Sequence, residues 1–293
     1  MSRIKNFFIL LLNFLIISTI IFLTSILLTG GFDYEFYGIT LSGNRLSKPT
    51  FYLLSLLLIK YLIHTNFRNN IQIYSLKCVK DKKILFFYLL TSLTLTALLI
   101  TLYLFFPQKN IWNLDLESGF GTAFSGLLLF GVAFLSLFIY AFEKNNNIPK
   151  KKIWIPIVAL FILLAFDEIF SLHEWLAAPN IINKFTNQQP FLSKLSWITL
   201  YIPVFIITTG YFIYFIFIKL FKSRAAIISL ILAGIAYTLS ITDEAIMLIF
   251  NLRGSEFHII QVASEEGLEL LGTILVLVSF SFYYKKIVTT NYN

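Results

Sequence analysis

The chain has 293 residues, of which 58% are hydrophobic and 13% charged, and its mean hydropathy is +0.80. Soluble domains carry about 25% charged residues, so this composition excludes an ordinary soluble protein and indicates an integral membrane protein. The net charge of +8 does not point to nucleic acid, because the Lys and Arg residues lie in loops between apolar runs. With a single cysteine, Cys78, the chain has neither a disulfide framework nor a thiolate metal cluster.

Eight apolar segments each approach the ~20 residues that a helix needs to cross about 30 Å of hydrocarbon. We place these spans at 6–29, 49–65, 84–106, 119–142, 153–174, 195–218, 225–250 and 259–284. The first follows two basic residues as in a signal peptide, but no alanine precedes Ala97, so an Ala-x-Ala cleavage site is missing and we expect an uncleaved span. Strands are not expected, because an open sheet edge in lipid would leave backbone groups unpaired. The predicted fold is an all-α polytopic membrane protein with one domain, 1–293.

The distribution of positive charge predicts the orientation of these spans. With the N-terminus in the cytoplasm, 16 of the 23 Lys and Arg residues lie on the cytoplasmic side. We therefore expect a multipass protein of the cytoplasmic membrane with both termini inside the cell. Residues 1–142, spans one to four, are expected to form a scaffold that contacts lipid. Four glycines in and around span four offer small surfaces for close helix packing: Gly119, Gly121, Gly126 and Gly131.

Acidic residues are concentrated in the remaining part, 153–284. Eight of the 15 Asp and Glu residues lie within spans five, seven and eight, where ionisable groups are costly: Asp167, Glu168, Glu174, Asp243, Glu244, Glu265, Glu266 and Glu269. Antiparallel spans place all of them in the half of the membrane away from the cytoplasm. The short connection between spans seven and eight predicts an antiparallel hairpin, so that the acids of these two spans can face each other.

The positions of polar residues around each predicted helix indicate which of them share a face. In one continuous helix over 153–174, Asp167, Ser171 and Glu174 would share a face. Span eight carries a second polar stripe, formed by Gln261, Glu265, Glu269 and Gly272 and extended by His258.

So many carboxylates at one depth require raised pKa values, bound cations or a water-filled vestibule. A divalent cation such as Mg, Mn, Ca, Fe or Zn accounts for most of the residues at once. The predicted ligands are carboxylates and imidazoles: Asp167, His173, Glu174, Asp243, Glu244, His258, Glu265 and Glu269. Glu168 or Glu266 is the candidate catalytic base. Alternatively, His173 is an interfacial histidine and His258 a loop residue.

Known membrane metal motifs do not fit. His173-Glu174 lacks a second histidine at Ala177, which excludes the zinc-protease His-Glu-x-x-His helix. Glu265-Glu266 is followed by Leu270 where CAAX-type intramembrane proteases have Arg.

The motifs Asp-Glu-x-x-x-x-His-Glu at 167–174 and Glu-Glu-x-x-Glu at 265–269 resemble those of a group of bacterial multipass membrane proteins without assigned function. This resemblance covers spans five to eight and implies no activity.

Two function classes are consistent with such a site. The first is a metal-dependent hydrolase that acts on a lipid or lipid-linked substrate, which arrives sideways from the bilayer. The second is a transporter coupled to protons or metal cations, for which ionisable groups should reach both membrane faces. A structural polar cluster without catalysis is the third alternative. The sequence predicts neither the oligomeric state nor the substrate.

Overall fold

The computed structural model describes residues 2–29, 33–36, 39–42, 47–64, 82–106, 113–114, 119–176, 195, 197–250 and 257–292. Helices occur at all eight predicted places: α1 (Ser2–Thr29), α2 (Ser47–Ile63), α4 (Lys82–Phe105), α5 (Phe120–Asn145), α6 (Trp154–Phe170) continued by α7 (Leu172–Leu176), α10 (Trp197–Ile218), α11 (Arg224–Phe250) and α12 (His258–Tyr292). Short 3-10 turns, η1 (Lys151–Ile153) and η2 (Leu220–Lys222), precede α6 and α11. The all-helical membrane fold predicted from composition is confirmed.

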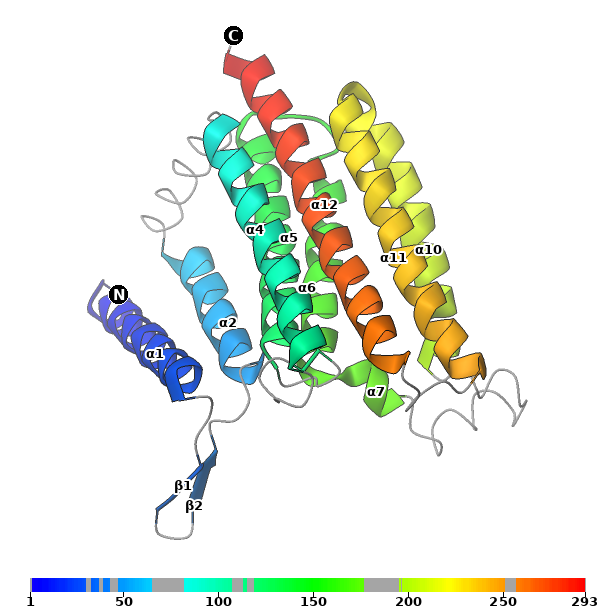
Figure 1. Ribbon diagram of the computed structural model, residues 1–293. Coiled ribbons are helices and arrows are strands. Elements are labelled where there is room, and N and C mark those ends of the chain that lie inside the picture. Colours follow the sequence, from blue (N-terminus) through cyan, green and yellow to red (C-terminus); the bar gives the residue numbers. More distant parts are fainter. Residues whose placement is uncertain are drawn as a thin grey trace.

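A short hairpin is the exception to the expected absence of strands. Strands β1 (Asp33–Phe36) and β2 (Ile39–Ser42) pair in antiparallel register, with Asp33 opposite Ser42. The hairpin lies between α1 and α2, away from the other helices (Figure 1). It is a connection between helices, so the argument against sheet edges in lipid does not apply to it.

Within the described part of the chain, six helices are long and apolar enough to cross a membrane: α1, α5, α6, α10, α11 and α12. The apolar part of α4, Leu89–Phe105, is shorter, and α2 has 17 residues. The chain is therefore a multipass membrane protein.

Helix α12 lies in the middle of the bundle, where it contacts α11, α5 and α4 (Figure 1). The predicted pairing of α11 with α12 is confirmed, since these two antiparallel helices pack along each other. Helix α5 packs against both α6 and α12. At Gly126, an added Cβ would lie 2.7 Å from the Ile169 Cδ1 atom of α6, so glycine permits this close approach. Helices α1 and α2 lie at one side of the bundle (Figure 1).

The core contains aromatic rings from several helices. Trp154 of α6 is fully buried, and its ring lies edge-on to Phe215 of α10 at 4.9 Å and to Phe280 of α12 at 5.2 Å between centroids. Phe161 lies two helical turns further along α6, and its ring centroid is 6.5 Å from that of Phe280. Edge-to-face packing of this kind adds about 0.5–1.5 kcal/mol per pair beyond the area that it buries. These contacts tie α6, α10 and α12 together.

Candidate functional site

The acidic residues of α6, α11 and α12 lie at one end of the bundle. Figure 1 shows α7, the end of α11 and the beginning of α12 at the same end, opposite the C-terminus. We call this the acidic end, and the end formed by the end of α5, η1 and η2 the opposite end. The antiparallel course of these helices explains why the acids of α6 lie at the same level as acids 75 to 102 positions later in the sequence.

Asp167 is the centre of the first group. Its Oδ1 atom accepts hydrogen bonds from the backbone N–H of His173 at 2.9 Å and from the Tyr201 hydroxyl of α10 at 3.1 Å. Its Oδ2 atom lies 3.4 Å from Nδ1 of His173. Both side chains are mostly buried, at 17% exposed for Asp167 and 19% for His173. The carboxylate therefore fixes both the backbone and the ring of His173.

A break in the helix makes this geometry possible. Helix α6 ends at Phe170, and Ser171 adopts a left-handed conformation with φ of 52° before α7 begins. The turn brings the His173 amide back to a side chain six residues earlier. The predicted continuous helix over 153–174 is therefore wrong, so it no longer supports the predicted shared face of Asp167, Ser171 and Glu174. The Glu174 side chain lies outside the described part of the structure.

The second group joins α11 to α12. The Ser240 hydroxyl donates to Glu269 Oε1 at 2.9 Å, and the hydroxyls of Tyr237 and Thr273 share a hydrogen bond of 2.6 Å. Thr273 also donates to the backbone carbonyl of Glu269 at 3.0 Å. Gly272 allows the tyrosine ring to lie against the helix, because an added Cβ would be 3.0 Å from it. These contacts fix Glu269 between the two helices.

Glu265 lies one helical turn nearer the acidic end. Its Oε2 atom accepts a hydrogen bond of 2.6 Å from Gln261 Nε2. The carboxyl group is also close enough to Glu244, Glu269 and Asp243 to interact electrostatically with each of them. These four acids are partly buried, and like charges at such separations repel in a medium of low dielectric. A bound cation or retained protons would relieve this repulsion.

The remaining predicted residues lie in the same region. Glu168 interacts electrostatically with Tyr237, which places the carboxyl of α6 near the α11–α12 group. Glu266 is partly buried on α12, and His258 is the first residue of that helix. In the part of the chain that the structure describes, no three His, Cys, Asp or Glu side chains form a group that could hold a metal ion. The divalent metal remains a prediction.

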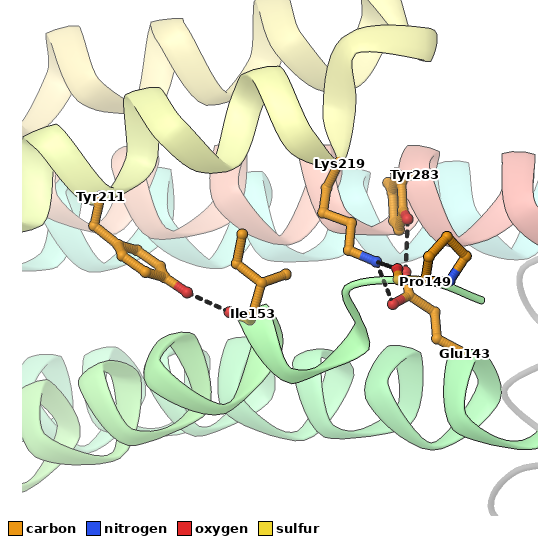
Figure 2. Close-up of polar contacts among 6 residues, drawn as sticks. All are labelled: Glu143, Pro149, Ile153, Tyr211, Lys219 and Tyr283. Carbon is orange, nitrogen blue, oxygen red and sulfur yellow. Dashed lines mark hydrogen bonds and ion pairs between the residues drawn. The ribbon is translucent and has the colours of Figure 1, made fainter. Parts of the chain in front are cut away.

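A buried ion pair at the opposite end was missed by the sequence analysis. Lys219 Nζ lies 2.5 Å from Glu143 Oε2 and donates to the Pro149 carbonyl at 2.9 Å, while the Tyr283 hydroxyl donates to Glu143 Oε1 at 2.6 Å (Figure 2). Glu143 is fully buried and Lys219 is 7% exposed. The sequence held one signal: Glu143 is the single acid in α5 and directly follows an apolar run. The charge count places Lys219 among the loop Lys and Arg residues on the cytoplasmic side.

Hydrogen bonds from α10 to the turn before α6 complete this end. The Tyr211 hydroxyl donates to the carbonyl of Ile153 at 2.5 Å (Figure 2). In the first turn of α11, the Ala226 carbonyl accepts a hydrogen bond of 2.7 Å from the Ser279 hydroxyl of α12. These groups are paired within the protein, as expected where lipid supplies no hydrogen bonds, whereas the buried Nε1 of Trp154 at the start of α6 has no hydrogen-bond partner among the described residues.

Comparison with known proteins gives one family. The family model described as "Domain of unknown function (DUF8692)" matches residues 84–284, which run from α4 to α12. This range includes the acidic end and the buried Glu143–Lys219 pair. No curated protein and no solved structure matches the chain.

Proposed function

Because the chain belongs to the DUF8692 family, whose description assigns no activity, we propose a function from geometry: a membrane hydrolase that cleaves an ester or phosphoester bond of a lipid-like substrate with a divalent cation. The observation that carries the proposal is the pairing of Asp167 with His173. The substrate class follows from the location of this pair in a bundle of apolar, membrane-spanning helices, which lipid surrounds.

Asp167 prepares His173 for proton transfer. A carboxylate beside Nδ1 favours the tautomer that carries its proton there and leaves the lone pair on Nε2. The same arrangement orients histidines that act as general bases and histidines that bind metal ions. The role of Asp167 in this proposal is to position the ring, since its two oxygen atoms already receive three contacts from His173 and Tyr201.

The α11–α12 carboxylates supply the oxygen atoms for a cation. Glu265 has three acidic neighbours within electrostatic range, and carboxylate oxygens suit Mg, Mn, Ca, Fe and Zn. Cation binding requires the Glu265 and Glu269 side chains to rotate away from Gln261 and Ser240. The ion would polarise the scissile carbonyl or phosphoryl oxygen. Glu168 or Glu266 would accept a proton from the attacking water, and His173 would pass this proton on to the leaving oxygen.

We further propose that the acidic end faces away from the cytoplasm. This follows from the excess of Lys and Arg on the side of the termini. The proposed protein therefore resides in the cytoplasmic membrane of the cell and presents its site to the outer leaflet.

The test separates the cation from the acid–base pair. Purified protein is analysed for Zn, Fe, Mn, Mg and Ca, and its melting temperature is recorded with and without chelator. Glu265→Gln and Glu269→Gln should release the ion and remove the effect of chelator, because an ion stabilises the folded state to which it binds. Asp33→Asn on the β1–β2 hairpin is the matched control and should change neither.

Activity is measured on a fluorogenic phospholipid in mixed micelles. His173→Gln and Asp167→Asn should lower the rate by about 100-fold or more while the ion stays bound, as expected for loss of a group that transfers a proton. Wild-type protein that holds no metal, ignores chelator and leaves the phospholipid intact contradicts the hydrolase and favours a structural cluster.

Proton- or cation-coupled transport is the second candidate, and the buried Glu143–Lys219 pair favours it. Transport requires ionisable groups toward both membrane faces, and this pair lies at the end opposite the acidic residues. Vesicles that contain the protein and a pH-sensitive dye would show proton uptake that Glu265→Gln abolishes. The hydrolase predicts no such uptake.

A further inference from the structure

Helix α10 is attached to the bundle mainly at its two ends. In its most apolar window, 6% of the residues are buried, compared with 67% in α5. No residue from 199 to 214 is buried, whereas Ile198 at one end and Phe215 and Leu220 at the other are. The middle of α10 therefore has few contacts that resist its movement relative to the bundle.

The attachment at the opposite end is strong. Lys219 directly follows α10, and its ammonium group is buried against Glu143 and the Pro149 carbonyl (Figure 2). Phe215 packs against the Trp154 ring, and Tyr211 donates to the backbone before α6. Separation here would leave a charge buried without its partner, which is among the most costly changes in a protein interior.

The attachment at the acidic end includes a hydrogen bond that can break without leaving a buried charge unpaired. The Tyr201 hydroxyl donates to Asp167 at 3.1 Å, and Ile198 at the same end of α10 is buried. If Tyr201 leaves, Asp167 keeps the amide and the ring of His173 as partners. Its carboxylate is then still paired, so no unsatisfied buried charge results.

Two residues of α10 lower its resistance to bending. Pro203 lies inside the helix two positions after Tyr201, and it lacks the amide that would bond to the preceding turn. Gly210 has no side chain, and a Cβ added there would meet nothing within 4 Å. Neither position is held by packing, and both lie between the two attachments.

We propose that α10 is a lateral gate, whose acidic end swings away from α6 about the Lys219–Glu143 anchor and breaks the Tyr201–Asp167 hydrogen bond. Its opening exposes Asp167 and His173 to the bilayer, so the molecule admitted is one that carries acyl chains. This identity of the substrate rests on the proposed hydrolase, whereas the movement does not. From Tyr201 to Lys219 the helix is about 27 Å long, so a tilt of about 10° displaces the Tyr201 end by about 5 Å.

Pulsed electron–electron resonance in lipid nanodiscs tests the movement. All variants carry Cys78→Ser. One spin-label pair reports on the acidic end, Ile202→Cys with Leu163→Cys, and a second on the opposite end, Phe217→Cys with Ile155→Cys. All four side chains are exposed on α10 or α6, so labels should leave the packing intact. The first pair should show a second distance about 5 Å longer than the main one, and the second pair a single distance.

Tyr201→Phe removes the hydroxyl and should increase the population of the longer distance at the acidic end at least twofold. Tyr214→Phe is the matched control, because Tyr214 is an exposed tyrosine of the same helix, and it should leave both distributions unchanged. A single distance at the acidic end that Tyr201→Phe does not alter overturns the gate, as does an equal change at both ends. Phospholipid hydrolysis is not needed for this reading, so a gate without hydrolysis and hydrolysis without a gate are separate results.

Discussion

Replacement of Lys219 with methionine tests whether the ion pair at the opposite end is buried as the structure indicates. Methionine keeps the length of the side chain and removes its charge, so the fully buried Glu143 carboxylate would retain the Tyr283 hydroxyl as its hydrogen-bond donor. Loss of one partner from a buried pair costs about 3–5 kcal/mol, whereas a solvent-exposed pair contributes about 0–1 kcal/mol. We expect Lys219→Met to lower the free energy of unfolding in mixed micelles by about 3–5 kcal/mol.

The double variant Glu143→Leu/Lys219→Met distinguishes this cost from a general loss of packing. Apolar residues that replace both partners often leave stability unchanged or raise it, so the double variant should be more stable than Lys219→Met alone. Lys144→Met is the control, because Lys144 is the exposed neighbour of Glu143 on α5, and its effect should stay within about 0.5 kcal/mol. A loss below about 1 kcal/mol for Lys219→Met, or additive effects in the double variant, would refute the buried pair.

Three glycine substitutions test the helix contacts, and a labelling experiment tests the orientation. Gly126→Ala should destabilise the fold by about 1–3 kcal/mol because its Cβ meets Ile169, and Ile169→Val should restore part of this loss. Gly234→Ala, in open space on α11, should instead add about 0.5–1 kcal/mol to the free energy of unfolding. Gly272→Ala should cost about 1 kcal/mol by displacing the tyrosine of α11 from its hydroxyl partner on α12. Cys78, which lies outside the described residues, should react with an impermeant maleimide only after cells are opened; labelling of intact cells would reverse the predicted topology.

The helices could be predicted from the sequence because the bilayer imposes one dominant requirement on them. An apolar run of about 20 residues in lipid must form a helix to satisfy its backbone, whatever its neighbours are. The predicted span 225–250 therefore differs from α11 by one residue. The largest error is at the C-terminus, where α12 continues to Tyr292, eight residues beyond the predicted span. The additional residues include two lysines, because a helix can continue beyond the end of its hydrophobic run.

Side-chain partners could be predicted only where they follow from helix pairing. The short connection after α11 brings Ser240 within reach of Glu269, and hairpin geometry indicates such contacts. The left-handed Ser171 could not be predicted in this way. Serine has no special preference for that conformation, and the contacts of Asp167 with His173 that accompany it join two segments of different helices.

The Glu143–Lys219 pair could not be predicted from the sequence for a different reason. Charge counting assigns a lysine at the end of an apolar run to the aqueous loop, which is correct for most such residues. Here Lys219 directly precedes the 3-10 turn after α10, and two residues 76 positions apart meet in the interior. No local pattern encodes this meeting, because it depends on how α5, α10 and α12 pack.

The distance between the acidic end and the Glu143–Lys219 pair bears on the choice between hydrolysis and transport. Helix α12 carries both, with Glu269 near the acidic end and Tyr283 at the opposite end, about 21 Å apart along the helix. Between them, Phe280 packs against the rings of Trp154 and Phe215, and these three side chains are fully buried. An ion or proton that crossed this layer would require the rings to separate, because an apolar contact offers it no hydrogen-bond partner. The proposed hydrolysis requires no passage through this layer, because its residues lie together at the acidic end. The hydrolase is therefore the simpler function for this packing, and the transporter must add a movement of the aromatic layer to the movement of α10.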